Sequence, residues 1–257
     1  KASGDSLDLS EMFTVRYCYE DKADKYLRMY GSTNFSPGGS ILDVPFVWEK
    51  FGAVPEEVYS GLAYGEDKHN HGELHEVLQA YMRGVEANRN RRISTAWRKG
   101  LNGILDAYLG AVPQTFTYQG KTYTPQSFAD SLDFHEEDYV ELTSFMHHPF
   151  GGSFVLEVPD NWEHAPFYNV PIDSMEAYVQ RAIRNGQTVA WDGDISEKSF
   201  LARSGVAIYS DSLVTQQERQ EGFEKFETTD DHMMHIVGTA YEKEGKFYYI
   251  LKIPKSQ

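Results

Sequence analysis

The sequence predicts an α+β fold in which helices fill the first part of the chain and strands most of the second. Apolar residues recur at helical spacing in the first part, as in Leu74, Val77, Leu78 and Tyr81. Later segments are short, rich in Tyr, Thr and Val, and separated by turns that contain Gly or Pro. Helices followed by mostly strands are typical of the α+β class.

The helical part contains three segments. Ser10 is a residue type that caps helices, and it predicts a helix over residues 11–30. A short apolar segment follows at 41–51 and is disturbed by Pro45. Residues 72–110 carry one or two further helices.

The second part reads as short strands interrupted by two helices. A hairpin is expected over 116–124, followed by a short helix that Thr124 caps and that runs to Leu132. A longer helix is expected over 174–184, with Asp173 as its cap. Further strands are expected at 139–146, 154–158, 188–191, 206–210, 232–241 and 247–252.

The charge balance excludes some classes of partner. The net charge is -15, with 24 basic and 39 acidic residues, and such a surface repels phosphate backbones. No apolar run approaches the roughly 20 residues that cross a bilayer. Nucleic acid and membrane are therefore not expected as partners. The single cysteine, Cys18, is compatible with a reducing compartment, so a cytoplasmic location is favoured and a periplasmic one stays open.

One motif near the end of the chain is distinctive. The segment 231–238 reads Asp-His-Met-Met-His-Ile-Val-Gly, and an aromatic strand ending in Lys252 follows at 247–252. This pair is similar to the histidine strand and return strand of papain-like cysteine peptidases. Two further regions resemble the bleomycin hydrolase and aminopeptidase C branch of that superfamily. The first region consists of the segments Tyr168–Asp173 and Gly186–Asp194. The second consists of the segments Leu9–Glu11, Gly38–Gly39 and Glu49–Pro55.

The resemblance covers residues 7–252 and implies a two-lobed papain-like fold. It implies one peptidase domain over 1–257, with a mainly helical lobe at 1–112 and a mainly β-rich lobe at 113–257. The implied activity is removal of N-terminal residues from peptides through an acyl-thioenzyme, without a cofactor. The implied partners are a peptide substrate and further copies of the chain, commonly in a hexamer.

The resemblance assigns roles to four residues. His232 matches the general base of the family, while Gly38, Gly39 and Asp231 are assigned to substrate binding. Paired glycines allow a peptide backbone to approach closely. Without the resemblance, His232 would be an ordinary strand histidine and the two glycines a turn after Pro37.

Two parts of the family pattern are absent from this sequence. The Gln and Cys-Trp segment that supplies the nucleophile would precede the region around Leu9, and Ile253–Gln257 stands where Asn-Ser-Trp-Gly is expected. The domain is therefore expected to be incomplete at its N-terminus and after 252. Cys18 lies between two tyrosines in a helix interior, so we expect a buried structural residue.

Two alternatives remain open. A truncated or degenerate relative would bind peptides or assemble without cleaving them. A metal-binding module is suggested by His69, His71 and His75 together with nearby glutamates, although the hydrophilic stretch favours a solvated helix start and no metal site is expected there. His235 points away from His232 on a regular strand and is taken as structural.

Overall fold

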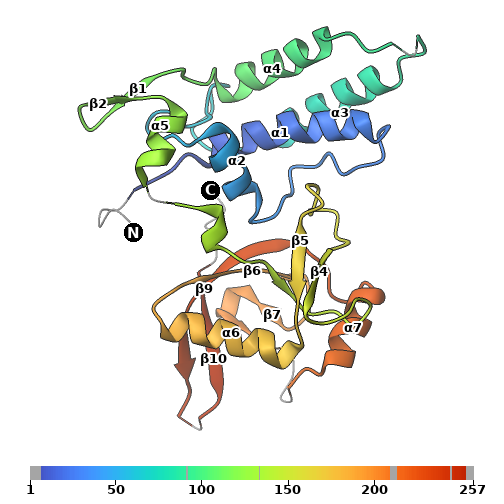
Figure 1. The fold of residues 1–257 in the computed structure, drawn as a ribbon, viewed down its shortest axis with the longest axis vertical. Coiled ribbons are helices and arrows are strands. Elements are labelled where there is room, and N and C mark those ends of the chain that lie inside the picture. Colours follow the sequence, from blue (N-terminus) through green and yellow to red (C-terminus); the bar gives the residue numbers. More distant parts are fainter. Residues whose placement is uncertain (1–6, 91, 133, 209–212, 244, 253–257) are drawn as a thin grey trace. The chain divides into compact units, whose positions relative to one another are not determined.

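The chain divides into two units, one ending at Tyr139 and the other beginning at Val140. The computed structural model describes residues 7–90, 92–132, 134–208, 213–243 and 245–252. Within that part of the chain, no helix combines the length and the apolarity that a membrane span needs. The mixture of helices and sheets confirms the predicted α+β class (Figure 1).

The first unit is mainly helical. Its elements are α1 (Glu11–Arg28), α2 (Asp43–Phe51), α3 (Gly72–Glu86), α4 (Ala96–Leu109), β1 (Phe116–Tyr118), β2 (Lys121–Tyr123), α5 (Pro125–Ala129) and the short 3₁₀ turns Asp130–Leu132 and Glu136–Asp138. The second unit contains β3 (Leu142–Thr143), β4 (Gly152–Val155), β5 (Pro166–Asn169), α6 (Ile172–Arg184), β6 (Val189–Gly193), β7 (Phe200–Leu201), a 3₁₀ turn Ala202–Ser204, β8 (Val206–Ala207), α7 (Gln216–Glu224), β9 (His232–Tyr241) and β10 (Phe247–Lys252).

Helix α1 begins as the sequence predicts. The Ser10 hydroxyl accepts a hydrogen bond from the Phe13 backbone N–H at 3.0 Å, which satisfies one of the unpaired donors of the first turn. Helices α3 and α4 lie beside α1 (Figure 1). The buried apolar residues of α3 and α4 are Leu74, Leu78, Met82, Leu101, Leu105 and Leu109, and they include Leu74 and Leu78 of the predicted helical spacing, whereas Val77 and Tyr81 are only partly buried.

Helix α2 tolerates its proline. Because the helix begins at Asp43, Pro45 falls in the first turn, where a backbone N–H has no partner within the helix. Gly52 ends the helix with a φ of 88°, a conformation that glycine adopts without strain. The segment 41–51 is therefore mostly helical.

The hairpin at 116–123 belongs to the helical unit. Strands β1 and β2 pair with Phe116 opposite Tyr123, and both rings lie within 5.5 Å of the Phe128 ring of α5. This aromatic packing holds the hairpin against α5. The predicted change from helical to strand-rich segments at 112–113 consequently lies inside the first unit.

The second unit contains the sheet that carries the distinctive motif. Its strand order is β10–β9–β6, with both pairs antiparallel, and α6 packs against β6 and β9. Strands β9 and β10 have the bounds that the sequence predicts, His232–Tyr241 and Phe247–Lys252. A second sheet has the order β3–β5–β4.

Several predictions for the second unit are wrong. The segment 139–146 forms a strand only at Leu142–Thr143, because the backbone of Phe145 bonds to the Asn169 side chain in place of a strand partner. Strand β5 and helix α7 were not predicted. Asp173 lies in the first turn of α6, which starts at Ile172 after Pro171, and is therefore not the cap.

Candidate functional site

His232 opens strand β9, directly opposite Gly193 of β6. The side chain of His232 is half-buried, Met234 and Ile236 are buried, and His235 and Val237 are exposed. Side chains alternate between the two faces of a strand, so the burial pattern places His232 on the face that also carries Met234. His235 occupies the opposite face.

Gly193 allows an aromatic side chain to lie close to His232. A Cβ atom at Gly193 would collide with the indole of Trp191, so the ring occupies the space that a side chain would fill. Trp191 remains partly exposed and pairs with Met234, two residues along the strand from His232. The residue opposite His232 is therefore a glycine that is covered by the Trp191 ring.

Asp231 and Asp194 organise the loop after β6. The Asp231 carboxylate accepts a hydrogen bond from the Ile195 N–H at 2.9 Å. Asp194 accepts from the N–H and hydroxyl of Ser196 and from those of Thr229, at 2.7–3.2 Å. Burial would raise the pKa of Asp194, but these hydrogen bonds outweigh it and lower the pKa to about 2. Both carboxylates therefore accept hydrogen bonds that hold the backbone of this loop in place.

Asp230 and Asp192 form a carboxylate pair beside this loop. Burial, together with a hydrogen bond to Asp192, raises the pKa of Asp230 to about 7. Burial also raises the pKa of Asp192. Two carboxylates in contact resist simultaneous ionisation, so the pair retains a proton at mildly acidic pH.

The Gly38–Gly39 loop belongs to the first unit. The buried Lys22 ammonium donates to the backbone oxygens of Ser36, at 3.0 Å, and of Gly38. A side chain at Gly39 would run into the carboxylate of Asp43. The space beside Gly39 is therefore occupied by the protein's own Asp43 carboxylate, and the expected approach of a peptide backbone to this glycine stays a prediction.

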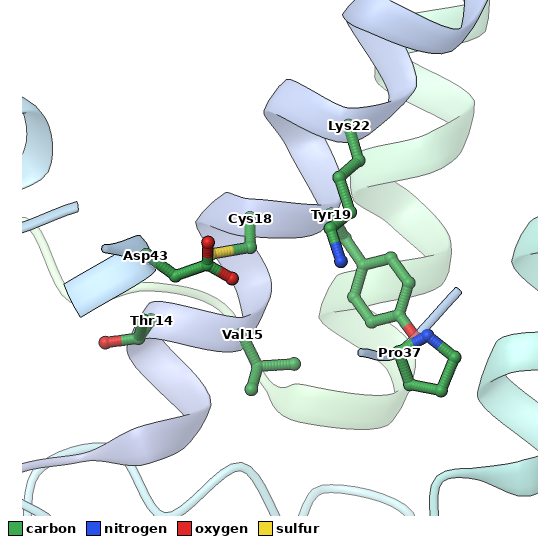
Figure 2. A pocket seen from close by; sticks show the side chains of 7 residues that line it. All are labelled: Thr14, Val15, Cys18, Tyr19, Lys22, Pro37 and Asp43. Atoms are coloured by element: carbon green, nitrogen blue, oxygen red, sulfur yellow. The ribbon is translucent and has the colours of Figure 1, made fainter. Parts of the chain in front are cut away.

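Next to this loop lies a pocket that encloses about 290 Å³, part of it open solvent (Figure 2). It is lined by Thr14, Val15, Cys18, Tyr19, Lys22, Pro37 and Asp43. Cys18 is 6% exposed and lies well inside α1, as the sequence predicted. A thiol in a helix interior lacks the N-terminal amides that lower the pKa of catalytic cysteines. The predicted approach of His232 to Gly38 and Gly39 joins residues of the two units and stays a prediction.

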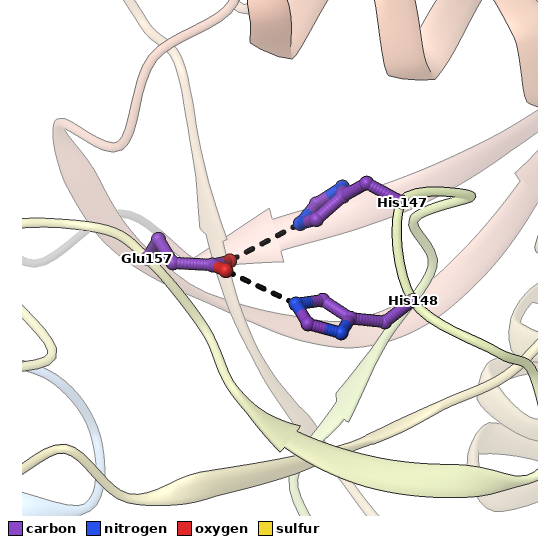
Figure 3. A group of neighbouring side chains, drawn as sticks. All are labelled: His147, His148 and Glu157. Carbon is purple, nitrogen blue, oxygen red and sulfur yellow. Dashed lines mark hydrogen bonds and ion pairs between the residues drawn. The ribbon is translucent and has the colours of Figure 1, made fainter.

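One cluster with metal-ligating side chains was missed by the sequence reasoning. His147, His148 and Glu157 bring one ligand atom each to within 4.8 Å of one another (Figure 3). The adjacent histidines were the available signal, but Glu157 follows an intervening strand whose pairing the sequence did not reveal. No other group of this kind occurs among the described residues, which include His69, His71 and His75.

The comparisons with known proteins support the fold. No protein-family model and no curated protein sequence matches the chain. The structure is similar to the crystal structure of PepW from Lactobacillus rhamnosis HN001 (DR20), determined as the selenomethionine derivative, with a TM-score of 0.66 and 17% identity. The match covers 96% of this chain and 66% of PepW, so the chain spans slightly less than two thirds of that protein's length. The two proteins share a fold across almost the whole of this chain.

Proposed function

We propose that this chain forms the larger part of a cysteine aminopeptidase, in which His232 is the general base. The observation that carries the proposal is the fold shared with PepW, a peptidase, over 96% of the chain. The Asp-His motif opening β9 and the aromatic strand β10 beside it support the assignment of His232. The activity would belong to a polypeptide that contains a nucleophilic thiol in addition to these residues.

His232 would act twice in each cycle. The imidazole takes the thiol proton, and the thiolate attacks the scissile carbonyl carbon. The imidazolium then protonates the departing amine, which leaves an acyl-thioenzyme and a neutral imidazole. The same imidazole removes a proton from water, and the hydroxide releases the acyl group and restores the thiol.

Gly38, Gly39 and Asp231 would hold the substrate. A peptide can bond to the backbone of a glycine loop because glycine has no side chain of its own to block the approach, although here the Asp43 carboxylate lies against Gly39. Asp231 uses one carboxylate oxygen for the Ile195 N–H, so its other oxygen is the one that would face the positively charged N-terminus of a peptide. These assignments require the two units to meet at a cleft.

Cys18 does not fit the role of nucleophile. It is buried within α1 and next to Tyr19, another buried residue. The 257-residue chain alone is therefore expected to release no product from an aminoacyl fluorogenic substrate. Turnover that iodoacetamide abolishes would contradict this and return Cys18 to consideration.

Two histidines on one strand provide a matched test in the complete encoded polypeptide. His232→Ala should lower kcat/KM by at least about 10³-fold, because a triad member is lost. His235→Ala, on the opposite face of β9, should change it by less than about twofold. Equal effects of the two substitutions would remove His232 from the mechanism.

A second candidate function is peptide binding without cleavage. It is favoured by the burial of Cys18, the sole cysteine of the chain. Fluorescence anisotropy with a labelled peptide would distinguish the two, since a binder retains affinity while the complete polypeptide shows no turnover. The predicted homo-oligomer is tested separately by light scattering.

A further inference from the structure

We propose that His147, His148 and Glu157 form a binding site for a zinc-type divalent cation. His147 Nε2 lies 3.1 Å from one carboxylate oxygen of Glu157, and His148 Nε2 lies 3.0 Å from the other. Both rings point toward the carboxylate from neighbouring positions of one turn (Figure 3). The site is remote in sequence from His232 and does not depend on the proposed peptidase chemistry.

The donor set and spacing suit zinc. Two ligand atoms at about 2.0–2.2 Å from a tetrahedral Zn²⁺ lie about 3.3 Å apart. The nitrogen-to-oxygen distances of 3.0 and 3.1 Å, which run to the two different oxygens of Glu157, are close to that value, whereas the three ligand atoms together lie only within 4.8 Å of one another, so a bound ion would draw the two imidazoles closer together. Two imidazoles and one carboxylate leave a fourth position for water, and the imidazoles favour zinc over the hard cations Mg²⁺ and Ca²⁺.

Aromatic packing fixes the two imidazole rings. The His148 ring stacks on Phe154, with centroids 4.1 Å apart and planes inclined by 23°. The His147 ring is nearly parallel to that of Phe223, at 5.7 Å, and meets the Phe154 ring edge-on. A ligand held in this way loses little side-chain freedom when an ion binds.

Buried asparagines fix the backbone on both sides of the site. Asn169, which is fully buried, donates to the carbonyls of His148 and Pro149 at 3.0 and 3.2 Å. Asn161 donates to the carbonyl of Leu156, the residue before Glu157, at 3.0 Å. The turn with the histidines and the segment with the carboxylate are thus both anchored in the interior of the unit.

Glu157 gives the site access to solvent and a negative charge. Its side chain is 55% exposed, so an ion can enter without the protein opening. Each of its two carboxylate oxygens already faces an imidazole nitrogen, at 3.1 and 3.0 Å, so the carboxylate is positioned as an anionic ligand beside both histidines.

Gln220 is the residue that opposes ion binding. Its Oε1 accepts from the Met146 N–H at 2.6 Å, which orients its Nε2 to donate to Glu224 at 2.8 Å and to His147 Nδ1 at 3.0 Å. His147 therefore carries its proton on Nε2 when no ion is bound. An ion at Nε2 moves this proton to Nδ1, where it faces the amide donor, and this conflict weakens binding.

The conflict provides a sharp test. In the exchange Gln220→Glu with Glu224→Gln, a carboxylate accepts from His147 Nδ1 and the net charge is unchanged. Carboxylates in this position strengthen zinc ligation by histidine. The exchange should raise zinc affinity by about 10–100-fold. The exchange Gln217→Glu with Glu221→Gln is the matched control, since that pair has the same spacing on α7 and is exposed.

The measurement is competition of the purified chain with a zinc indicator, using ZnCl₂ alone as ligand. We expect binding that weakens at least about 10-fold in His148→Ala and in Glu157→Gln and is unchanged in His235→Ala. Cobalt bound in place of zinc should show the absorption of a four- or five-coordinate ion. Zinc affinity that is the same in His148→Ala, or that fails to rise in the Gln220 exchange, would overturn the proposal. Equal competition by Mg²⁺ would do the same.

Discussion

The two units of the molecule bury different kinds of side chain. In the first, the side chains without measurable exposure are apolar residues of helices, such as Leu78 of α3 and Leu105 of α4, although Lys22 and Arg16 are also buried there. In the second, the most deeply buried large side chain is that of Asn169, with Asn161 and Gln220 nearly as buried. The first unit is stabilised mainly by apolar packing, and the second relies on polar side chains that bond to backbone.

The difference has consequences for how each interior tolerates change. An apolar core responds to the volume that is removed, because the cost comes from lost contacts and a cavity. A buried polar side chain responds to chemistry, because its removal leaves backbone groups without partners. Substitutions that conserve volume therefore separate the two cases.

The largest stability effect is expected at Asn169. Its side chain accepts from the Phe145 N–H at 2.9 Å and donates to the Phe145, His148 and Pro149 carbonyls. Asn169→Leu keeps the number and branching of side-chain heavy atoms but removes all four bonds, and should lower the free energy of unfolding by about 4 kcal/mol. Urea denaturation followed by circular dichroism would measure it. A loss below about 1 kcal/mol would refute the polar account of this unit.

A smaller effect is expected in the helical unit, where volume should decide. Leu78→Ala should cost about 3 kcal/mol, since the side chain is fully buried between α3 and its neighbours. Leu78→Met, which nearly conserves volume, should cost less than about 1.5 kcal/mol in the same urea experiment. If both substitutions lower the free energy of unfolding by the same amount, packing volume does not explain the stability of the first unit.

The carboxylate pair predicts a pH dependence of the stability of the second unit. The folded-state pKa of Asp230, about 7, lies above the ordinary value of about 3.9, so the folded state holds a proton that the unfolded state releases. The bound proton therefore contributes to the free energy of unfolding in acid, and this contribution is lost as the pH rises from about 4 through about 7. Asp194, whose folded pKa of about 2 lies below the ordinary value, acts in the opposite sense: it contributes stability above about pH 4, and that contribution is lost as the pH falls towards 2.

Asp230→Asn tests this directly. The substitution should remove the fall in stability between about pH 4 and 7 and stabilise the protein by about 1–2 kcal/mol at pH 8, after allowance for solvent screening. Asp67→Asn makes the same change of charge at an exposed position of the first unit and is the matched control. Thermal melts across this pH range would show whether the two variants differ.

The same difference explains which elements the sequence could predict. Helical spacing of Leu74, Leu78 and Leu101 reports apolar burial, so α3 and α4 were predicted from periodicity. Strands β9 and β10 were predicted with their bounds because aromatic and β-branched residues follow a motif. The segment around Phe145 was predicted as a long strand, because a pattern of apolar residues does not show that an asparagine distant in sequence will bond to their backbone.

The candidate site was predictable to a different extent at each residue. His232 could be assigned from its neighbours in the motif, and its place opposite Gly193 required only the pairing of β9 with β6. The cluster of His147, His148 and Glu157 could not be assigned. Its side chains converge because Phe154 and Phe223, which belong to two separate elements, pack against the imidazole rings. Local sequence identifies the ligand side chains of such a cluster but not the directions in which they point.

A difference of about 1 kcal/mol is expected between the helix caps of the two units. Ser10 is buried, and besides accepting from Phe13 its hydroxyl donates to the Tyr59 carbonyl at 2.5 Å. Thr215 caps α7 in a capping box with Glu218, and its bonds are exposed to water. Ser10→Ala should cost about 2 kcal/mol because a buried carbonyl loses its partner, whereas water can replace Thr215 at a cost of about 1 kcal/mol or less. Urea unfolding of Ser10→Ala and Thr215→Ala would give the ratio, and a larger loss at Thr215 would show that burial does not set the strength of these caps.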